Sequence, residues 1–285
     1  MFDALKKHWP EYLLEAAGLA FFMINAAWIT TLLEYPESPV HQAIESKFLR
    51  RIPLGIAMGV VIAIIIYNPG GKRSGAHINP AVTWAFLRLG KIGKRDAFFY
   101  TVFQFLGAIA AAFTMKALLG KPFTHMKVRY ATTFPGPEHG PWVAFAAEFA
   151  ITFFLMLVVL VFMSNKKLEK FTGAAVAFLI MVYLWFETPL SGMSLNPART
   201  FGSALAGGVW DGLWIYFTAP PLAALLAAEV FVRMKGADGI ACARLAHGRD
   251  AESFLCGDQP LPEFPVQKEG AAPLKPAPRV PETAL

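Results

Sequence analysis

The sequence predicts an all-α membrane protein with six transmembrane helices and two shorter half-helices, arranged as an inverted repeat. Three observations lead to this prediction. Of the 285 residues, 55% are hydrophobic and 16% are charged, whereas a soluble domain carries about 25% charged residues. Six apolar stretches approach or reach the length of about 20 residues that crosses a bilayer. Two similar polar phrases interrupt this apolar pattern, one in each half of the chain.

The six apolar stretches are the expected membrane spans. They run approximately over residues 12–33, 52–67, 98–119, 142–163, 171–186 and 213–232. Two of them are a little short, which tilt and extension of the helix into its flanks can accommodate. A soluble protein with deeply buried helices fits less well, because the stretches are too long and too numerous.

The distribution of positive charge predicts the orientation of the chain. More than two thirds of the 26 Lys and Arg residues fall in the N-terminal segment, in the loops after the second and fourth stretches, and in the tail. Cytoplasmic loops carry the excess of Lys and Arg, so both termini are expected in the cytoplasm. The net charge of +6 thus reflects orientation, and nucleic acid is not an expected partner. The compact loops and simple tail favour a bacterial inner membrane.

The two halves of the chain resemble each other. The first opens with LEAAGLAFFMINAA and the second with AEFAITFFLMLVVL, and each has one Glu near its start, Glu15 and Glu148. Each half has three spans and carries its polar phrase after the second span. An odd number of spans per half gives the halves opposite orientations, which is the inverted repeat common in transporters and channels.

The polar phrases are SGAHINPAVTW at residues 74–84 and SGMSLNPARTFG at residues 191–202. Their shared triplets are Asn79, Pro80 and Ala81 in the first and Asn196, Pro197 and Ala198 in the second. Asn is a favoured N-cap and Pro a favoured first helical residue, so each triplet predicts a helix start. The apolar stretches that follow are too short to span, and non-helical backbone must avoid lipid. We therefore expect two half-helices that meet near the membrane centre, with the Asn NH₂ groups facing the lumen.

These paired phrases resemble the two signature loops of the aquaporin, or major intrinsic protein, family, over roughly residues 11–233. The resemblance implies a narrow pore in each subunit, usually a homotetramer, and passive passage of water with small neutral solutes. No cofactor, metal or enzymatic chemistry is expected. The resemblance also implies a channel domain over residues 1–234, with repeats over about 11–119 and 142–233. Residues 235–285 are rich in Pro, Gly, Ala and charge, and this composition predicts a cytoplasmic tail.

The resemblance implies four residues for the outer constriction of the pore. Arg199 follows the second triplet, whereas Val82 occupies the matching place after the first. By position, the other three are Met193, Leu184 and Met58. Water-selective members typically carry an aromatic residue and a His beside the Arg. The more apolar set here leaves open, as an alternative, a facilitator for glycerol, urea or metalloid acids.

Other positions are closer to the water-selective pattern. Glycerol facilitators usually carry Asp immediately after the second N-P-A-R sequence, and this chain has Thr200 there. Ala204 is small, and Tyr216 and Phe217 form an aromatic pair near the start of the sixth span. Together these positions favour water as the main solute, with passage of small neutral solutes.

Three further polar residues are expected within or beside the membrane. An acid inside a membrane suggests function by default, but in this family Glu15 and Glu148 look like braces for the backbone of the re-entrant loops. His77 fits the first family loop and is expected to bond to backbone near its half-helix. An inverted-repeat secondary transporter and a non-conducting scaffold remain the rival functions.

The tail carries the only two cysteines of the chain, Cys242 and Cys256, with His247 between them. Three ligands at this loose spacing are a weak signal for a metal site. Because the tail is expected in the cytoplasm, free thiols are the expected state. The end of the tail is rich in Pro, Ala and charge, and it is expected to be disordered.

Overall fold

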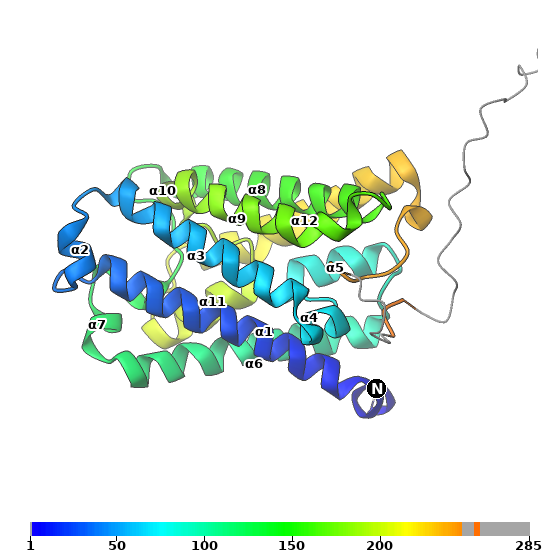
Figure 1. Ribbon diagram of the computed structural model, residues 1–285, viewed down its shortest axis with the longest axis horizontal. Helices are drawn as coiled ribbons and strands as arrows, with labels where there is room; N and C mark the ends of the chain where they lie inside the picture. Colours follow the sequence, from blue (N-terminus) through cyan, green and yellow to red (C-terminus); the bar gives the residue numbers. More distant parts are fainter. Residues whose placement is uncertain (1, 247–253, 257–285) are drawn as a thin grey trace, which may run out of the picture.

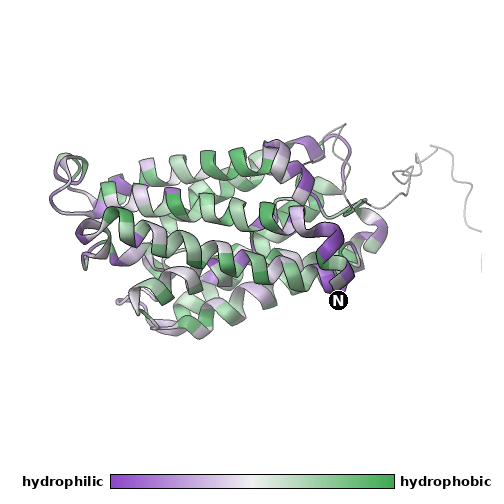
Figure 2. Ribbon diagram, turned by 90° about the horizontal axis from the view of Figure 1, so that it is seen from below, coloured by the Kyte–Doolittle hydropathy of each residue, from purple (hydrophilic) through white to green (hydrophobic). Residues whose placement is uncertain are grey.

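The computed structural model describes residues 2–246 and 254–256 of the chain. Within them, six helices are long and apolar enough to cross a membrane. They are α1 (Phe2–Glu34), α3 (Lys47–Tyr67), α6 (Lys94–Leu119), α8 (Gly140–Met163), α9 (Thr172–Phe186) and α12 (Leu213–Lys235). The six predicted spans are confirmed, and most helices extend a few residues into the polar flanks. Hydrophobic residues occupy the middle of the bundle and hydrophilic residues its two ends (Figure 2).

The helix α1 begins ten residues before the predicted span. Its backbone departs from helical geometry at His8, two residues before Pro10. Proline inside a helix removes a hydrogen bond and clashes with the preceding turn, which produces such kinks. The residues before the kink form a separate polar turn at the end of the bundle.

Two half-helices lie between the six spans. The helix α5 (Pro80–Arg88) follows the short helix α4 (Pro69–Ser74), and α11 (Pro197–Gly207) follows the short helix α10 (Thr188–Ser191). They lie in opposite halves of the bundle, inside the ring of spans (Figure 1). In addition, α5 packs against α12 and α11 packs against α6. Each half-helix therefore rests on the last span of the other repeat, which confirms the predicted inverted repeat.

The remaining elements are short connections at the ends of the bundle. They are the helices α2 (Pro39–Ala43) and α7 (Lys121–Thr124), and the 3₁₀ turns η1 (Arg129–Ala131), η2 (Glu169–Phe171) and η3 (Ala237–Gly239).

Small residues let α6 pack closely between two neighbours. A Cβ atom added at Gly107 would lie 2.2 Å from the carbonyl oxygen of Ala16 in α1. One added at Gly202 of α11 would lie 2.7 Å from the backbone of Ala108 in α6. Such contacts between small residues are typical of helices packed within a membrane, and here they fix α11 against the wall of the bundle.

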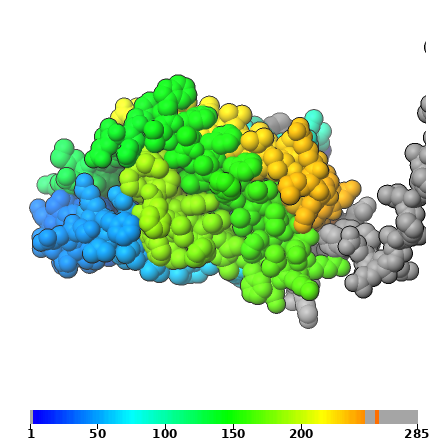
Figure 3. Space-filling model, turned by 90° about the horizontal axis from the view of Figure 1, so that it is seen from above, coloured from blue at the N-terminus to red at the C-terminus, as the bar shows by residue number. Residues whose placement is uncertain are grey.

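The outer surface of the bundle is apolar. Figure 3 shows one lateral face, on which α8 and α9 (green) lie beside each other. Phe154 of α8 and Phe178 of α9 are more than half exposed. Large apolar side chains exposed along membrane-length helices suit contact with lipid. The protein is therefore an integral membrane protein.

The first part of the tail does not leave the bundle. After α12, residues 240–246 pack against the end of the bundle that holds α4, and Ile240 and Ala243 have no exposed surface. The backbone N–H of Ala243 donates to the carbonyl oxygen of Leu255 at 3.4 Å. The expected disorder concerned the end of the tail, which lies outside the described residues.

The expectation of free thiols at Cys242 and Cys256 is wrong, because the two residues form a disulfide with Cα atoms 4.4 Å apart. The pairing of Ala243 with Leu255 brings the two cysteines together, and the expected compartment does not indicate this contact within the tail. His247 lies outside the described residues, and the two bonded sulfurs do not offer the thiolates that the three-ligand metal site would need.

Candidate functional site

The two half-helices begin at the predicted Asn residues. The Asn79 side-chain oxygen accepts from the N–H of Ala81 at 2.9 Å, and that of Asn196 accepts from Ala198 at 3.0 Å and from Arg199 at 3.2 Å. Pro80 and Pro197 are the first helical residues. Side-chain capping of this kind satisfies N–H groups that the first turn leaves without partners.

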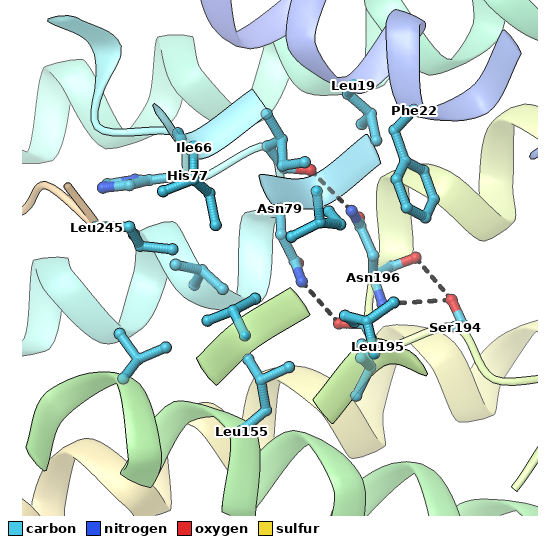
Figure 4. A pocket seen from close by; sticks show the side chains of 17 residues that line it. Leu19, Phe22, Ile66, His77, Asn79, Leu155, Ser194, Leu195, Asn196 and Leu245 are labelled. Atoms are coloured by element: carbon cyan, nitrogen blue, oxygen red, sulfur yellow. Dashed lines mark hydrogen bonds between the residues drawn. The ribbon is translucent and has the colours of Figure 1, made fainter. Parts of the chain in front are cut away.

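The same two Asn residues also join the two loops to each other. Asn79 Nδ2 donates to the carbonyl oxygen of Leu195 at 2.8 Å, and Asn196 Nδ2 donates to that of Ile78 at 2.8 Å (Figure 4). The amide NH₂ groups were expected to face the lumen. Because an amide NH₂ has two hydrogens, each Asn uses one for the opposite loop and keeps one for the cavity.

A carboxylate supports the first loop. Glu15 of α1 accepts from the backbone N–H groups of His77 at 3.0 Å and Ile78 at 2.5 Å, and from the hydroxyl of Ser74 at 2.8 Å. The loop needs this support because Ala76 and Ile78 have positive φ angles of 54° and 41°, which are unfavourable for residues other than glycine.

An equivalent arrangement supports the second loop. Glu148 of α8 accepts from the backbone N–H groups of Ser194 and Leu195, both at 2.7 Å, and from the hydroxyl of Ser191 at 2.6 Å. Met193 and Leu195 again have positive φ angles, 56° and 61°. The two loops thus repeat the same strained geometry and the same carboxylate support.

Two tyrosines complete this symmetry, and the sequence analysis assigned neither of them to the loops. Tyr100 of α6 donates its hydroxyl hydrogen to the carbonyl oxygen of Ser74 at 2.6 Å, and Tyr216 of α12 donates to that of Ser191 at 2.5 Å. Both tyrosines are fully buried. Their matching place on the last span of each half was a sequence signal that could have identified the pair.

The second loop also contains a buried acid that the sequence analysis missed. Glu187 follows α9 and contacts the Ser191 hydroxyl, which also contacts Glu148. A hydroxyl has one hydrogen to donate, so one of the two carboxyl groups must carry a proton. Glu148 also accepts from two backbone N–H groups, which suits a carboxylate. Burial, and then the charge of Glu148, raises the pKa of Glu187 above its ordinary range, and both observations favour the proton on Glu187.

A cavity of about 70 Å³ runs along the two Asn residues. Its wall is mostly apolar, and its polar side chains come from the two loops: His77, Asn79, Ser194 and Asn196. Such cavities, apolar with a few placed polar groups, are the usual form of small-molecule paths and sites. In Figure 4, His77 and Leu245 lie at one end and Ser194 and Asn196 at the other. We call the His77 end, beside α4, the α4 mouth.

The four predicted constriction residues do not line this cavity. Met58, Leu184 and Met193 are buried in the same core cluster, and Arg199 lies in the first turn of α11. The Nη1 atom of Arg199 is buried and has no hydrogen-bond partner in the described part of the chain. An unpaired buried donor is costly, and this one lies directly after the second Asn-Pro-Ala triplet.

His77 connects the first loop to the tail. Its Nε2 lies 2.8 Å from the carbonyl oxygen of Ala243, and its Nδ1 lies 3.1 Å from the hydroxyl of Thr83. A carbonyl oxygen only accepts, so Nε2 carries the hydrogen in this arrangement. The expected backbone partner of His77 is therefore supplied by residue 243, far along the chain, rather than by the neighbouring half-helix.

Comparison with known proteins agrees with this arrangement. A family model described as major intrinsic protein matches residues 5–231. Aquaporin NIP2-2 of Zea mays is 34% identical over 192 residues, which is 67% of this chain and 63% of the relative. Nodulin-26 of Glycine max is 34% identical over 179 residues, 62% of this chain and 64% of the relative. The matches thus span just under two thirds of these relatives' lengths.

A solved structure has the same fold. The X-ray structure of the aquaglyceroporin from Plasmodium falciparum superposes with a TM-score of 0.66, covering 79% of this chain and 96% of that chain at 21% identity. The paired Asn caps, the repeated loop supports and the match to nearly all of the bundle lead to one assignment. The chain belongs to the major intrinsic protein family.

Proposed function

We propose that the protein is a passive transmembrane channel for water that also passes small neutral solutes. The observation that carries this proposal is the meeting of two half-helix N-termini at Asn79 and Asn196 on the wall of one cavity. Relatives named aquaporins and a structural neighbour named an aquaglyceroporin support it. Such a channel moves solutes down their gradients and makes no covalent bonds, so the protein is not an enzyme.

The electrostatics of the site suit a neutral solute. The N-terminus of a helix carries a partial positive charge, and α5 and α11 both direct this end to the cavity. The remaining amide hydrogens of the two Asn residues offer donors to a water oxygen. With Arg199 on the α11 side, these positive groups disfavour the passage of cations and protons.

The outer constriction is proposed to consist of Arg199, Met193, Leu184 and Met58. Three of these four side chains are apolar and buried, so Arg199 alone would bind the passing solute by hydrogen bonds. This composition favours a second candidate function, a facilitator mainly for glycerol, urea or metalloid acids. The two candidates share the pore and differ only in which solute passes faster.

The membrane setting extends the proposal. We propose that both termini face the cytoplasm, because Lys and Arg concentrate in the loops on that side. A homotetramer is the assembly that family membership supports. The bacterial inner membrane expected from the compact loops has no support from the relatives compared, which come from plants and a protozoan.

Stopped-flow light scattering of proteoliposomes tests the proposal. Water permeability well above that of empty liposomes is expected, together with a ranking of glycerol and urea that separates the two candidates. Arg199→Ala is expected to raise permeability to solutes, and Leu184→His is expected to reduce that of glycerol more than that of water. Leu222→Ala, on the exposed face of α12, is the control. Permeability equal to that of empty liposomes both with and without a thiol reductant, or transport only with an ion gradient, contradicts a passive channel.

A further inference from the structure

The α4 mouth is covered by the tail. Residues 240–246 cross this end of the bundle, where the N–H of Leu245 donates to the carbonyl oxygen of Gly75 at 3.2 Å. The His77 ring donates to the carbonyl oxygen of Ala243 at 2.8 Å. The tail is thus hydrogen-bonded to both sides of residue 76, in the loop that leads into the half-helix α5.

The covering segment is packed rather than loosely laid on the surface. Leu245 and Ala246 are buried to at least 95%, and Leu245 forms part of the cavity wall together with His77 and Val82. A Cβ atom at Gly75 would lie 2.5 Å from the Ala243 carbonyl oxygen, so even the smallest side chain would displace the segment. An apolar side chain of the tail therefore lines the α4 end of the cavity.

A second tail segment holds the first in place. Residues 254–256 pair with Ala243 through Leu255 and carry Cys256, the disulfide partner of Cys242. The ring of Phe254 stacks on that of His8 at a centroid distance of 3.9 Å. The cross-link therefore ties the cover of the mouth to a second anchor on α1.

We propose that residues 240–246 and 254–256 form a redox-controlled stopper of the α4 mouth, with the Cys242–Cys256 disulfide as the site at which a dithiol reductant acts. This inference rests on the proposed channel function. With the disulfide intact, the stopper keeps Leu245 in the path. After reduction the segments separate, Leu245 leaves the cavity wall, and the path is open.

The reducing step needs access to one sulfur, and the structure provides it on one side. Cys242 has no exposed surface. Cys256, in contrast, lines an open cavity of about 350 Å³, and Lys91 lines the same cavity. One thiolate of a dithiol attacks Sγ of Cys256, the S–S bond breaks, and Cys242 leaves as a thiolate that takes up a proton. The second thiol of the reductant then displaces Cys256, which yields two protein thiols and the oxidised dithiol, a two-electron exchange.

The disulfide controls the stopper through the freedom of the released chain. A cross-link over 14 residues restricts the conformations that the segment gains when it detaches. Reduction removes this restriction, so detachment becomes more favourable while the contacts of the stopper itself are unchanged. The chain has no other cysteines, so any response of the permeability to a thiol reductant originates at this pair.

Water permeability of the full-length protein in liposomes tests the stopper, with and without dithiothreitol. Reduction is expected to raise the permeability of the wild type by about fivefold or more, a typical size for coupled sites. The double variant Cys242→Ser/Cys256→Ser is expected to match the reduced protein in both conditions. Leu245→Ala is expected to raise the permeability without reductant, and Leu222→Ala on the lipid face is the control.

Equal permeability of the oxidised, reduced and double-variant proteins, all above empty liposomes, overturns the stopper and leaves the channel intact. If every variant equals empty liposomes, the channel function fails instead. In that case, the hydrogen exchange of the backbone amides of residues 240–246 tests the stopper separately. If the stopper detaches on reduction, these amides exchange faster in the reduced protein. Unchanged protection of these amides overturns it independently of any conduction.

Discussion

At the scale of single residues, the site depends on a small number of buried polar groups that each serve two partners. Asn79 and Asn196 cap one half-helix and hold the opposite loop, while Glu15 and Glu148 satisfy two backbone N–H groups each. Removing such a residue leaves several buried donors without acceptors, and each costs about 1–3 kcal/mol. The loops are therefore sensitive to single substitutions at these four positions.

Glu148→Ala is expected to lower the stability of the protein by several kcal/mol, because the N–H groups of Ser194 and Leu195 lose their acceptor. Thermal unfolding in detergent, followed by tryptophan fluorescence, measures the effect. Thr152→Val is the control one turn along α8, since the Thr152 hydroxyl is buried without a hydrogen-bond partner in the described chain. Equal midpoints for the two variants would show that Glu148 does not hold the loop.

The stopper is expected to loosen in acid. His77 lies outside the six spanning helices, and burial lowers its pKa to about 4. When the stopper detaches, water reaches the ring and its pKa returns toward about 6.5. The closed form thus binds fewer protons, so its stability is fully present above about pH 6.5 and is lost as the pH falls toward 4.

Water permeability of the oxidised protein between pH 7.5 and pH 5 measures this effect and is expected to rise on acidification. Glu15, whose carboxylate accepts from the backbone of His77, and Tyr100, whose ring lies 5.2 Å from the imidazole, also face His77. His77→Gln keeps a donor for Ala243 but does not titrate, so it separates the imidazole from these two groups. A pH dependence that persists in His77→Gln would exclude the imidazole as its source.

At the scale of elements, the sequence was informative where structure is local. The six spans and the starts of both half-helices follow from apolar length and from the N-cap preference of Asn before Pro. What the sequence did not reveal depends on contacts between distant residues. The bond of His77 to Ala243 joins residues 166 positions apart, and no local pattern indicates that Leu245 completes the wall of the cavity.

The position of the half-helix α11 depends on its contact with α6. Gly202→Ala places a methyl group 2.7 Å from the backbone of Ala108, and overpacking of this kind typically costs about 1–3 kcal/mol. A lower unfolding midpoint and a reduced water permeability are expected together, because α11 carries Asn196 and Arg199. Leu205→Ala, at a partly exposed position of the same helix, is expected to change both much less. Wild-type behaviour of Gly202→Ala would show that this contact does not position α11.

At the scale of the whole molecule, the inverted repeat places two equivalent loops around one cavity, and the tail makes the two ends of that cavity different. Among the described residues, Glu15 and Tyr100 hold the first loop by hydrogen bonds. Glu148 and Tyr216 hold the second loop in the same way. The constriction of Arg199 and its apolar neighbours stays a prediction on the α11 side. The stopper belongs to the α4 side alone.

The central claim is that water crosses the membrane through the cavity between the two Asn residues. The most direct test is the water permeability of the reduced protein in liposomes, measured as a function of temperature. A pore predicts a permeability far above that of the lipid with a weak temperature dependence, because water moves without entering the hydrocarbon. A permeability and temperature dependence equal to those of protein-free liposomes would contradict the account.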